Sequence, residues 1–276
     1  MYRFDYNNIS KLFEDPVILA LYASGDENRK HQTKHDLNHV LLVLDVANKL
    51  AAAIQALFPD MMSEHVLNVI IPLAAFLHDI GGGIDADNHA EAGARWVRTY
   101  LKKLGFDRKT VTEIYRIIAG HRSEVVLGAN SFKRPDFADA AWAIVVIADK
   151  AVGDEERVRP EPAAELARLR EAHKMSEFQG SAHDQVTFAI KSSDLVVDGR
   201  EIVLKLRIDG EVASPEQIYT LYGKRFHGCG KAALYLGFVF RLEFNGVRFY
   251  YDEGLQSWRP FRTISATMPN VDDNAT

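Results

Sequence analysis

The stretch Leu77-His78-Asp79-Ile80-Gly81-Gly82-Gly83 places two potential metal ligands, His78 and Asp79, side by side. It follows the run Leu73-Ala74-Ala75-Phe76, which is apolar on every side and therefore predicts a buried helix. The three glycines are typical of a helix end. A buried imidazole and a buried carboxylate are costly unless they are paired or bind a metal ion. The stretch therefore predicts a metal site at the end of a core helix.

Further histidines and aspartates lie at the ends of neighbouring predicted helices. A helix from Lys34 to about residue 57 presents one apolar face and carries His39. Asn88 and Glu91 have the spacing of a capping box, which makes His89 the first residue of the next helix. A later helix ends at Gly120-His121, residues 122–138 are expected to be a polar loop, and an apolar helix over residues 140–148 ends at Asp149-Lys150. The candidate metal ligands are His39, His78, Asp79, His89, His121 and Asp149.

The ligand types restrict the metal. Imidazole and carboxylate groups without a thiolate suit iron, manganese, magnesium or zinc. Asp79 has two carboxylate oxygens, so it could bridge two metal ions while His78 binds one of them.

This pattern resembles the HD-domain metal phosphohydrolase superfamily. The resemblance covers roughly residues 30–155 and rests on His39-Val40, on residues 73–81 and on Ile147-Ala148-Asp149. It implies an all-helical bundle whose core ligands are His39, His78, Asp79 and Asp149. Members of the superfamily that bind two metals add two histidines before the last aspartate. His89 and His121 match those positions, so the resemblance implies two divalent ions.

Two comparisons within the superfamily bear on the substrate. The cyclic-di-GMP hydrolases have a paired histidine followed by Gly-Tyr-Pro, and Gly120-His121-Arg122-Ser123 has neither. The ligand spacing is closer to that of the diadenosine tetraphosphate hydrolases, which lack a C-terminal part like this one. We therefore expect a small, phosphorylated, nucleotide-like substrate whose base, sugar and chain length stay open.

The ligands imply a hydrolytic mechanism. A divalent metal lowers the pKa of bound water (to roughly 7 on zinc, from ~15.7 in bulk), and the hydroxide then attacks phosphorus. Arg122 and Lys150, beside His121 and Asp149, would contact the phosphate if their side chains turn inward. The spacing His35-x-x-x-His39 resembles that of class I cyclic-nucleotide phosphodiesterases, which implies that His35 is the general acid.

In the C-terminal part, the spacing of apolar residues changes from the three- and four-residue steps of a helix to the two-residue steps of a strand. Apolar residues recur at every second position in residues 186–190 and 202–208, with a predicted turn at Asp198-Gly199 between them. The same alternation occurs in residues 238–244 and 247–251, on either side of a predicted turn at Asn245-Gly246. Ser214-Pro215 starts a helix between them. The fold class is therefore mainly α, with a small α+β domain made of an antiparallel sheet and one covering helix. The predicted divisions are 1–158 for the helical metal-binding domain, 159–184 for a connector helix, 185–262 for the α+β domain and 263–276 for a flexible tail.

Composition limits the partners and the location. The net charge of −5 argues against DNA binding. The single cysteine, Cys229, fits a reducing compartment. The N-terminus lacks the apolar core of a signal peptide, and we see no uncharged apolar run of membrane-spanning length. We expect a cytoplasmic protein with no membrane partner, which could form a homo-oligomer through the aromatic strands over residues 238–251.

Other interpretations of the same residues are open. The metal could be structural, which would make the chain a non-catalytic metal- or nucleotide-binding regulatory module of HD fold. Arg122 and Lys150 could be ordinary surface charges. His183 is expected to have no role in the site, and Glu155-Glu156-Arg157 is expected to be a solvated, charge-paired run.

Overall fold

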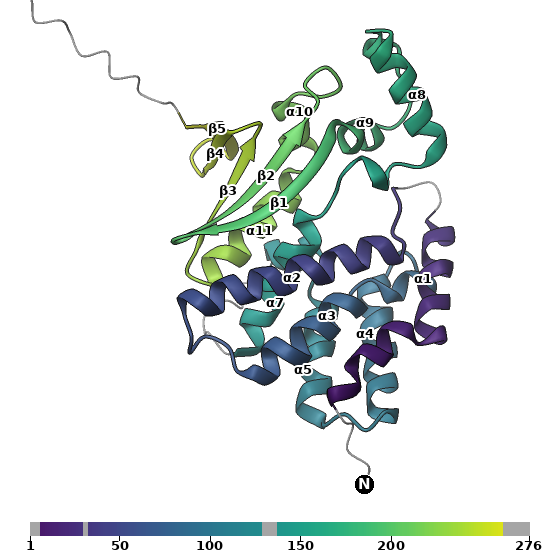
Figure 1. The fold of residues 1–276 in the computed structure, drawn as a ribbon, viewed down its shortest axis with the longest axis vertical. Helices are drawn as coiled ribbons and strands as arrows, with labels where there is room; N and C mark the ends of the chain where they lie inside the picture. The colour runs from purple at the N-terminus through teal and green to yellow at the C-terminus, as the bar shows by residue number, and fades with distance from the viewer. Residues whose placement is uncertain (1–5, 30–32, 129–136, 262–276) are drawn as a thin grey trace, which may run out of the picture.

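The computed structural model describes residues 6–29, 33–128 and 137–261 (Figure 1). The helical part contains nearly all of residues 6–151, and a sheet with its covering helices forms the other part of the molecule. The elements of the helical part are η1 (Tyr6–Glu14), α1 (Pro16–Asn28), α2 (Leu37–Leu57), η2 (Val66–Ile70), α3 (Ile71–Leu77), η3 (Ile80–Gly83), α4 (His89–Lys103), α5 (Arg108–Ala119), α6 (Ser123–Gly128) and α7 (Phe137–Ala151).

Helix α3 is the core helix that its composition predicts. All of its residues except Pro72 are buried, and α2, α5 and α7 pack around it. Pro72 stands in the first turn, where its missing N–H leaves no helical hydrogen bond unmade. Burying each Leu or Phe side chain contributes about 1.5–3 kcal/mol, so this helix fixes the position of whatever follows Leu77.

The three glycines after α3 allow close approach of three segments. A side chain at Gly81 would place its Cβ 1.9 Å from the carbonyl oxygen of His89, in the first turn of α4. At Gly82 it would lie 2.2 Å from the Arg29 guanidinium, and at Gly83 it would lie 2.3 Å from the carbonyl oxygen of Leu21 in α1. The glycine run therefore brings α1, the end of α3 and the start of α4 together.

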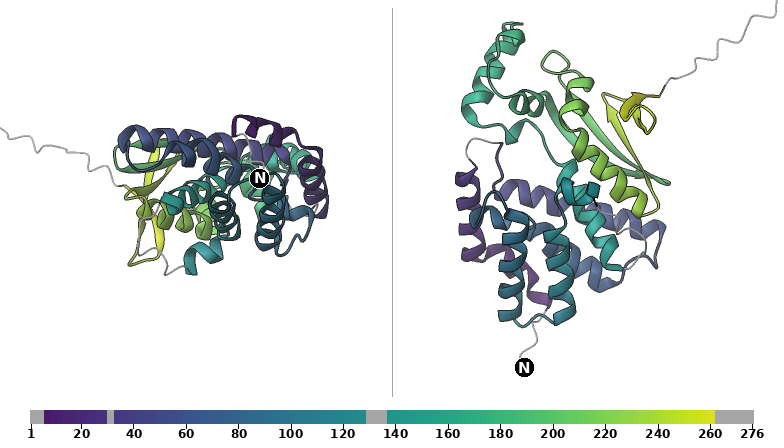
Figure 2. Two further views of the ribbon diagram at one scale, coloured as in Figure 1. Left: turned by 90° about the horizontal axis from the view of Figure 1, so that it is seen from below. Right: turned by 180° about the vertical axis from the view of Figure 1, so that it is seen from behind.

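The second part of the chain forms a five-stranded sheet with helices. Its elements are η4 (Glu155–Arg157), α8 (Pro160–Glu171), η5 (Met175–Glu177), α9 (Ala182–Ala189), β1 (Ile190–Asp198), β2 (Glu201–Ile208), α10 (Pro215–Leu221), α11 (Gly223–Tyr235), β3 (Val239–Phe244), β4 (Val247–Asp252) and β5 (Ser257–Pro260). The strand order is β1-β2-β3-β4-β5. Helices α10 and α11 lie over one face of the sheet (Figure 2), and α11 also packs on α7.

The α+β class is confirmed, and three details of its prediction are wrong. The sheet is mixed, because β2 and β3 are parallel and the other pairs are antiparallel. The connection through α10 and α11 crosses over the sheet and returns the chain in the same direction, which gives a parallel pair. Two helices cover the sheet instead of one, and a fifth strand follows β4. The two turns, at Asp198-Gly199 and Asn245-Gly246, lie where the sequence predicts them.

Several predicted helix ends also need correction. Residues 182–189 form α9, although Val186 and Phe188 alternate as in a strand. The expected loop after His121 contains α6, and its residues 129–136 lie outside the described chain. Helix α7 continues through Asp149 to Ala151. His89 does begin α4, but the Asn88 side chain makes no capping hydrogen bond and donates to Asp85 at 3.2 Å instead.

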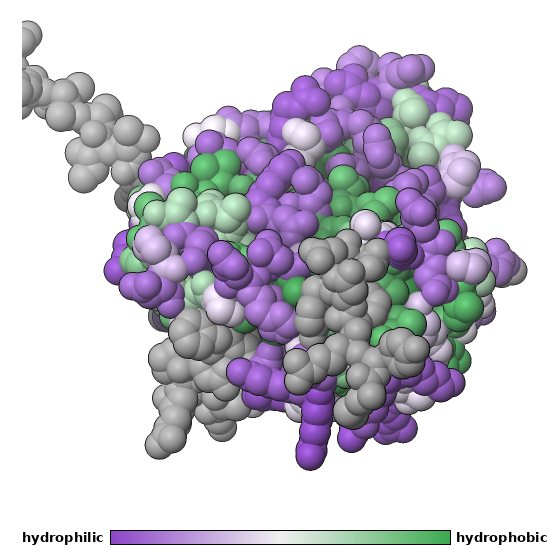
Figure 3. Space-filling model, turned by 60° about the horizontal axis from the view of Figure 1, so that its bottom comes forward, coloured by the Kyte–Doolittle hydropathy of each residue, from purple (hydrophilic) through white to green (hydrophobic). Residues whose placement is uncertain are grey.

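Two helical segments have the length and apolar composition of a membrane span. They are Leu37–Leu57 and Val66–Gly83, and their most apolar windows are 33% and 78% buried, respectively. Both pack within the helical bundle, and the burial of the second is that of a core helix. On the face shown in Figure 3, hydrophobic residues form separate patches between hydrophilic ones. The domain boundaries, the cytoplasmic location and the homo-oligomer stay predictions, and the predicted tail lies outside the described residues.

Candidate metal centre

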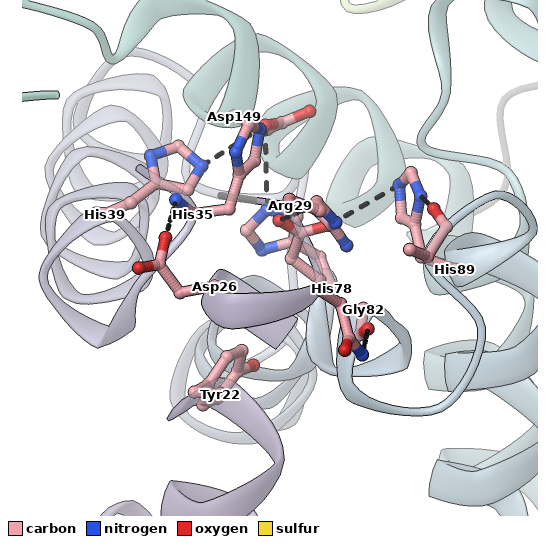
Figure 4. A network of polar contacts seen from close by, with 12 residues as sticks. Tyr22, Asp26, Arg29, His35, His39, His78, Gly82, His89 and Asp149 are labelled. Atoms are coloured by element: carbon pink, nitrogen blue, oxygen red, sulfur yellow. Dashed lines mark hydrogen bonds and ion pairs between the residues drawn. The ribbon is translucent and has the colours of Figure 1, made fainter. Parts of the chain in front are cut away.

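The structure brings all six candidate ligands together as two groups of three. His39, His78 and Asp149 form one group, and Asp79, His89 and His121 form the other. Within each group the potential ligand atoms lie within 4.8 Å of one another. Because His78 and Asp79 are adjacent in sequence but belong to different groups, the two groups are neighbours (Figure 4). This is the arrangement expected of a site that could hold two metal ions.

Each ligand is supplied by the end of a helix. His39 lies in the first turn of α2, where its backbone N–H donates to the Asp36 cap at 3.1 Å. His78 follows α3, His89 begins α4, and His121 comes two residues after α5. Asp149 lies in the last turn of α7. Helix ends carry the side chains into the centre, while the apolar faces of the same helices pack together.

Three of the imidazoles are oriented by backbone carbonyls. The Nδ1 atoms of His78, His89 and His121 lie 2.8, 3.3 and 2.7 Å from the carbonyl oxygens of Ala75, Ala86 and Ile118. Donation through Nδ1 leaves the Nε2 lone pair free to bind a metal. The Nε2 atom of His78 is buried and has no hydrogen-bond partner among the described residues. These residues fit a metal ion, because a metal would satisfy that atom.

Asp79 is held as a buried carboxylate by Arg29. The two side chains form a bidentate pair at 3.0 and 3.3 Å, and each is at most 6% exposed. Burial by itself raises the pKa of Asp79, but the Arg29 guanidinium and the surrounding histidines outweigh it and hold the pKa well below its usual value. His89 Nε2 lies 3.4 Å from the same carboxylate. Asp79 is therefore negatively charged and fixed in orientation.

Lys150 has the same relation to Asp149. Its Nζ atom lies 2.9 Å from Asp149 and donates to the carbonyl oxygen of His121 at 2.8 Å. Burial raises the pKa of Asp149, but Lys150 and His78 lower it by more, so the pKa lies well below its usual value. Burial lowers the pKa of His78, but Asp149 at 3.6 Å raises it by more. Each half of the centre thus has one carboxylate and one fixed cation beside it.

The other histidines of the centre are neutral at pH 7. Burial, together with the positive charge of Arg157 and of His78, lowers the pKa of His39 well below its usual value. Burial lowers the pKa of His121 to about 3, and it also lowers that of His89. A neutral imidazole is the form that binds a metal ion.

A cavity of about 610 Å³ opens over the centre. Its lining includes five of the six candidate ligands, and His78 lies beneath them. His35, Arg122 and Lys150, which the sequence assigns to catalysis, also line it. Lys150 is buried, while the side chain of Arg122 is 40% exposed and donates to the carbonyl oxygen of Asp87 at 2.9 Å.

The structure adds residues that the sequence analysis does not select. Arg29 pairs with Asp79, and Arg157 and Arg225 line the cavity. The prediction that residues 155–157 are a solvated run is wrong for Arg157, which is only 7% exposed. His183 and Tyr222 also line the cavity, so the C-terminal part of the chain supplies one of its walls. No local pattern marks these residues, because their partners are distant in sequence.

The helical part of the chain thus holds a candidate metal centre, which consists of two His/Asp groups beneath an open, charged cavity. Residues 36–170 match the family model described as "HD domain", and through this segment the chain belongs to the HD-domain superfamily. Most members of this family are metal-dependent hydrolases. A search of curated proteins found no match.

Proposed function

We propose that this protein is a metal-dependent phosphohydrolase that cleaves a phosphate ester or anhydride of a small, nucleotide-like substrate. The observation that carries the proposal is the pair of His/Asp groups at the base of a cavity that also contains fixed cations. Phosphoryl transfer depends mainly on positioning and on neutralising the charge of the phosphoryl oxygens. The fixed cations and candidate ligands that line this cavity would position a phosphoryl group and neutralise its charge.

The ligand set has no thiolate, so it would hold divalent ions that accept imidazole and carboxylate ligands. Iron, manganese, magnesium and zinc fit, and two neighbouring groups of three favour two ions per chain. When bound, such ions polarise a phosphoryl oxygen and lower the pKa of water. His39, His78 and Asp149 would hold one ion, and Asp79, His89 and His121 would hold the other.

The basic residues would orient the phosphate. Lys150 is fixed by Asp149 and the His121 carbonyl, so its charge needs no rearrangement when substrate binds. Arg122 lies at the opening, where it pairs with Glu124 at 3.4 Å. We assign Lys150 to charge neutralisation at the centre and Arg122 to capture of the substrate.

His35 is the proposed proton donor to the leaving oxygen. Its Nδ1 atom lies 2.6 Å from the carbonyl oxygen of Thr33, which leaves Nε2 for the substrate. Burial, together with Arg157, lowers the pKa of His35 to about 4, so it is neutral at pH 7 in the free protein. The negative charge of a bound phosphate would raise this pKa, so the role requires that substrate binding precedes protonation.

Replacing His35 with alanine is expected to lower kcat by about 10²–10⁴-fold, which is the usual contribution of a general acid. Metal content should not change, because His35 belongs to neither ligand group. His173→Ala is the matched control, since this histidine is exposed and pairs only with Glu211 among the described residues. Loss of metal from the His35 variant would show that His35 is a ligand, and an unchanged kcat would rule out the proton-donor role.

Turnover tests the proposed function. Protein loaded with manganese or iron should release phosphate or a phosphorylated product from phosphodiesters, phosphomonoesters or dinucleoside polyphosphates. If it binds such a compound and returns it unchanged, the chain is a regulatory module and the proposal is wrong.

A further inference from the structure

Arg157 and Arg225 face the cavity from outside the metal centre. Arg157 ends η4 and is buried, and Arg225 comes from the first turn of α11 in the C-terminal part. Arg225 follows Arg157 by 68 positions in the sequence, yet Arg157 Nη1 and Arg225 Nη2 both donate to the carbonyl oxygen of Val152, at 3.4 and 3.3 Å. Two guanidinium groups are therefore brought close together on one wall.

Among the described residues, the hydrogen-bond partners of these two side chains are neutral carbonyl groups. Arg157 donates to the carbonyl oxygens of Lys34 at 3.1 Å and Val152 at 3.4 Å. One nitrogen of Arg225, Nη2, lies 3.3 Å from three carbonyl oxygens, those of Asp149, Lys150 and Val152. The Tyr222 ring lies 4.9 Å from the Arg225 guanidinium carbon. Both guanidinium groups are thus fixed in position without losing their charge.

The remaining cavity cations differ, because each has a carboxylate. Arg29 pairs with Asp79, Lys150 with Asp149 and Arg122 with Glu124. Across the described ranges, no carboxylate lies within ion-pair distance of Arg157 or Arg225, although Asp87 and Asp184 also line the cavity. Burial and the neighbouring Arg225 lower the pKa of Arg157 to about 10. An anion between the two groups would relieve this repulsion.

The pair adjoins one half of the metal centre. Arg225 Nη2 lies 3.3 Å from the carbonyl oxygens of Asp149 and Lys150, at the end of α7. Asp149 belongs to the group of His39, His78 and Asp149, so the arginine pair adjoins this half of the centre through Arg225. An anion held by the arginines would therefore lie beside a phosphoryl group bound at that half.

We propose that Arg157 and Arg225 form a second anion subsite, which binds the phosphoryl group next to the one that is hydrolysed. This inference rests on the proposed function and narrows its substrate class to compounds with two adjacent phosphoryl groups, that is, phosphoanhydrides. Arginine suits this role because its planar fork binds phosphate oxygens in pairs. Arg225 also covers carbonyl groups at the end of α7, and a purely structural role there would not distinguish one anion from another.

The test compares two anions that differ by one phosphoryl group. Protein loaded with manganese, in constant excess Mn²⁺, is titrated by calorimetry with inorganic phosphate and with imidodiphosphate, which has a P–N–P bridge in place of P–O–P. Arg225→Gln and Arg157→Gln should each weaken imidodiphosphate binding by about 10-fold to 100-fold, because each removes charge-assisted hydrogen bonds. Phosphate binding should change less than about 3-fold, because the metal centre is intact.

Three further measurements complete the test. Lys224→Gln, a change at an exposed neighbour of Arg225, should leave both affinities unchanged. If a glutamine variant fails to fold, Arg225→Lys and Arg157→Lys keep the charge and should still lower the preference for imidodiphosphate, because they lose the planar fork. If the arginine variants weaken the binding of both anions equally, or change the binding of neither, the subsite proposal is wrong.

The subsite and the proposed function can fail separately. If no phosphate compound is hydrolysed but imidodiphosphate binding still depends on both arginines, the subsite stands and the hydrolase does not. If phosphomonoesters are hydrolysed as well as phosphoanhydrides, and the arginine variants affect both equally, the hydrolase stands and the subsite does not.

Discussion

Asp79→Asn is expected to lower hydrolase activity by at least about 10³-fold, because a metal ion supplies several kcal/mol of transition-state stabilisation. Asparagine keeps the shape of the side chain and removes its charge. It can no longer serve as an anionic metal ligand or neutralise Arg29, which lies 3.0 Å from Asp79. Metal content per chain should fall together with activity.

A buried arginine without its partner can also destabilise the fold, by about 3–5 kcal/mol. The double variant Arg29→Met/Asp79→Asn removes both members of the pair, so it should unfold at a higher temperature than Asp79→Asn alone and still be inactive. Asp45→Asn is the control for the charge change, because Asp45 is exposed on α2 and pairs with Lys49. Full metal content and full activity in Asp79→Asn would refute the assignment of the centre.

Gly81→Ala is expected to lower the free energy of unfolding by about 1–3 kcal/mol or more, as overpacking of a close contact does. The added Cβ would lie 1.9 Å from the His89 carbonyl oxygen and 2.5 Å from the Gly93 nitrogen. Both are backbone atoms of α4, so the strain cannot be relieved by turning a side chain. Helix α4 would have to shift, and His89 would move away from Asp79. We therefore expect a lower Tm and weaker metal binding from one methyl group.

Gly230→Ala is the matched control. Gly230 lies in α11, and a Cβ built there meets no atom within 4 Å. Alanine is favoured over glycine in a helix by about 0.5–1 kcal/mol, so this variant should be as stable as the original or slightly more stable. A Gly81→Ala protein that unfolds at the same temperature as Gly230→Ala would show that the glycine run does not fix the position of α4.

The candidate ligands could be predicted from sequence because each lies at the end of a helix with a readable apolar pattern. The buried composition of α3 and the glycines after it mark His78 and Asp79. The selection of His39, His89, His121 and Asp149 depends partly on the resemblance to a family whose model matches residues 36–170. Their gathering into two groups depends on helix packing, which only the structure shows.

The arginines could not be predicted, since their roles depend on contacts between distant segments. Arg29 precedes Asp79 by fifty residues. Arg157 stands in a run of charges that has the composition of a solvated surface, but η4 turns its side chain into the interior. Arg225 reaches the cavity only because α11 packs on α7.

The C-terminal part shows a related limit. Alternation predicts that a segment is a strand, but it does not encode the direction of the neighbouring strand, so it cannot predict the parallel pairing of β2 and β3. Residues 186–190 are too few to separate a strand from a short helix by periodicity alone. In the structure, Ala182–Ala189 forms helix α9, which packs against α8 and α10.

The most direct test of the account is the number of metal ions per chain. Elemental analysis would be made on protein purified without chelator, and again after addition of manganese or iron and removal of the excess. The account predicts about two ions per chain, one for each group of three ligands. A single ion would contradict the two-metal centre, and no ion in either sample would contradict the metal-dependent phosphohydrolase itself.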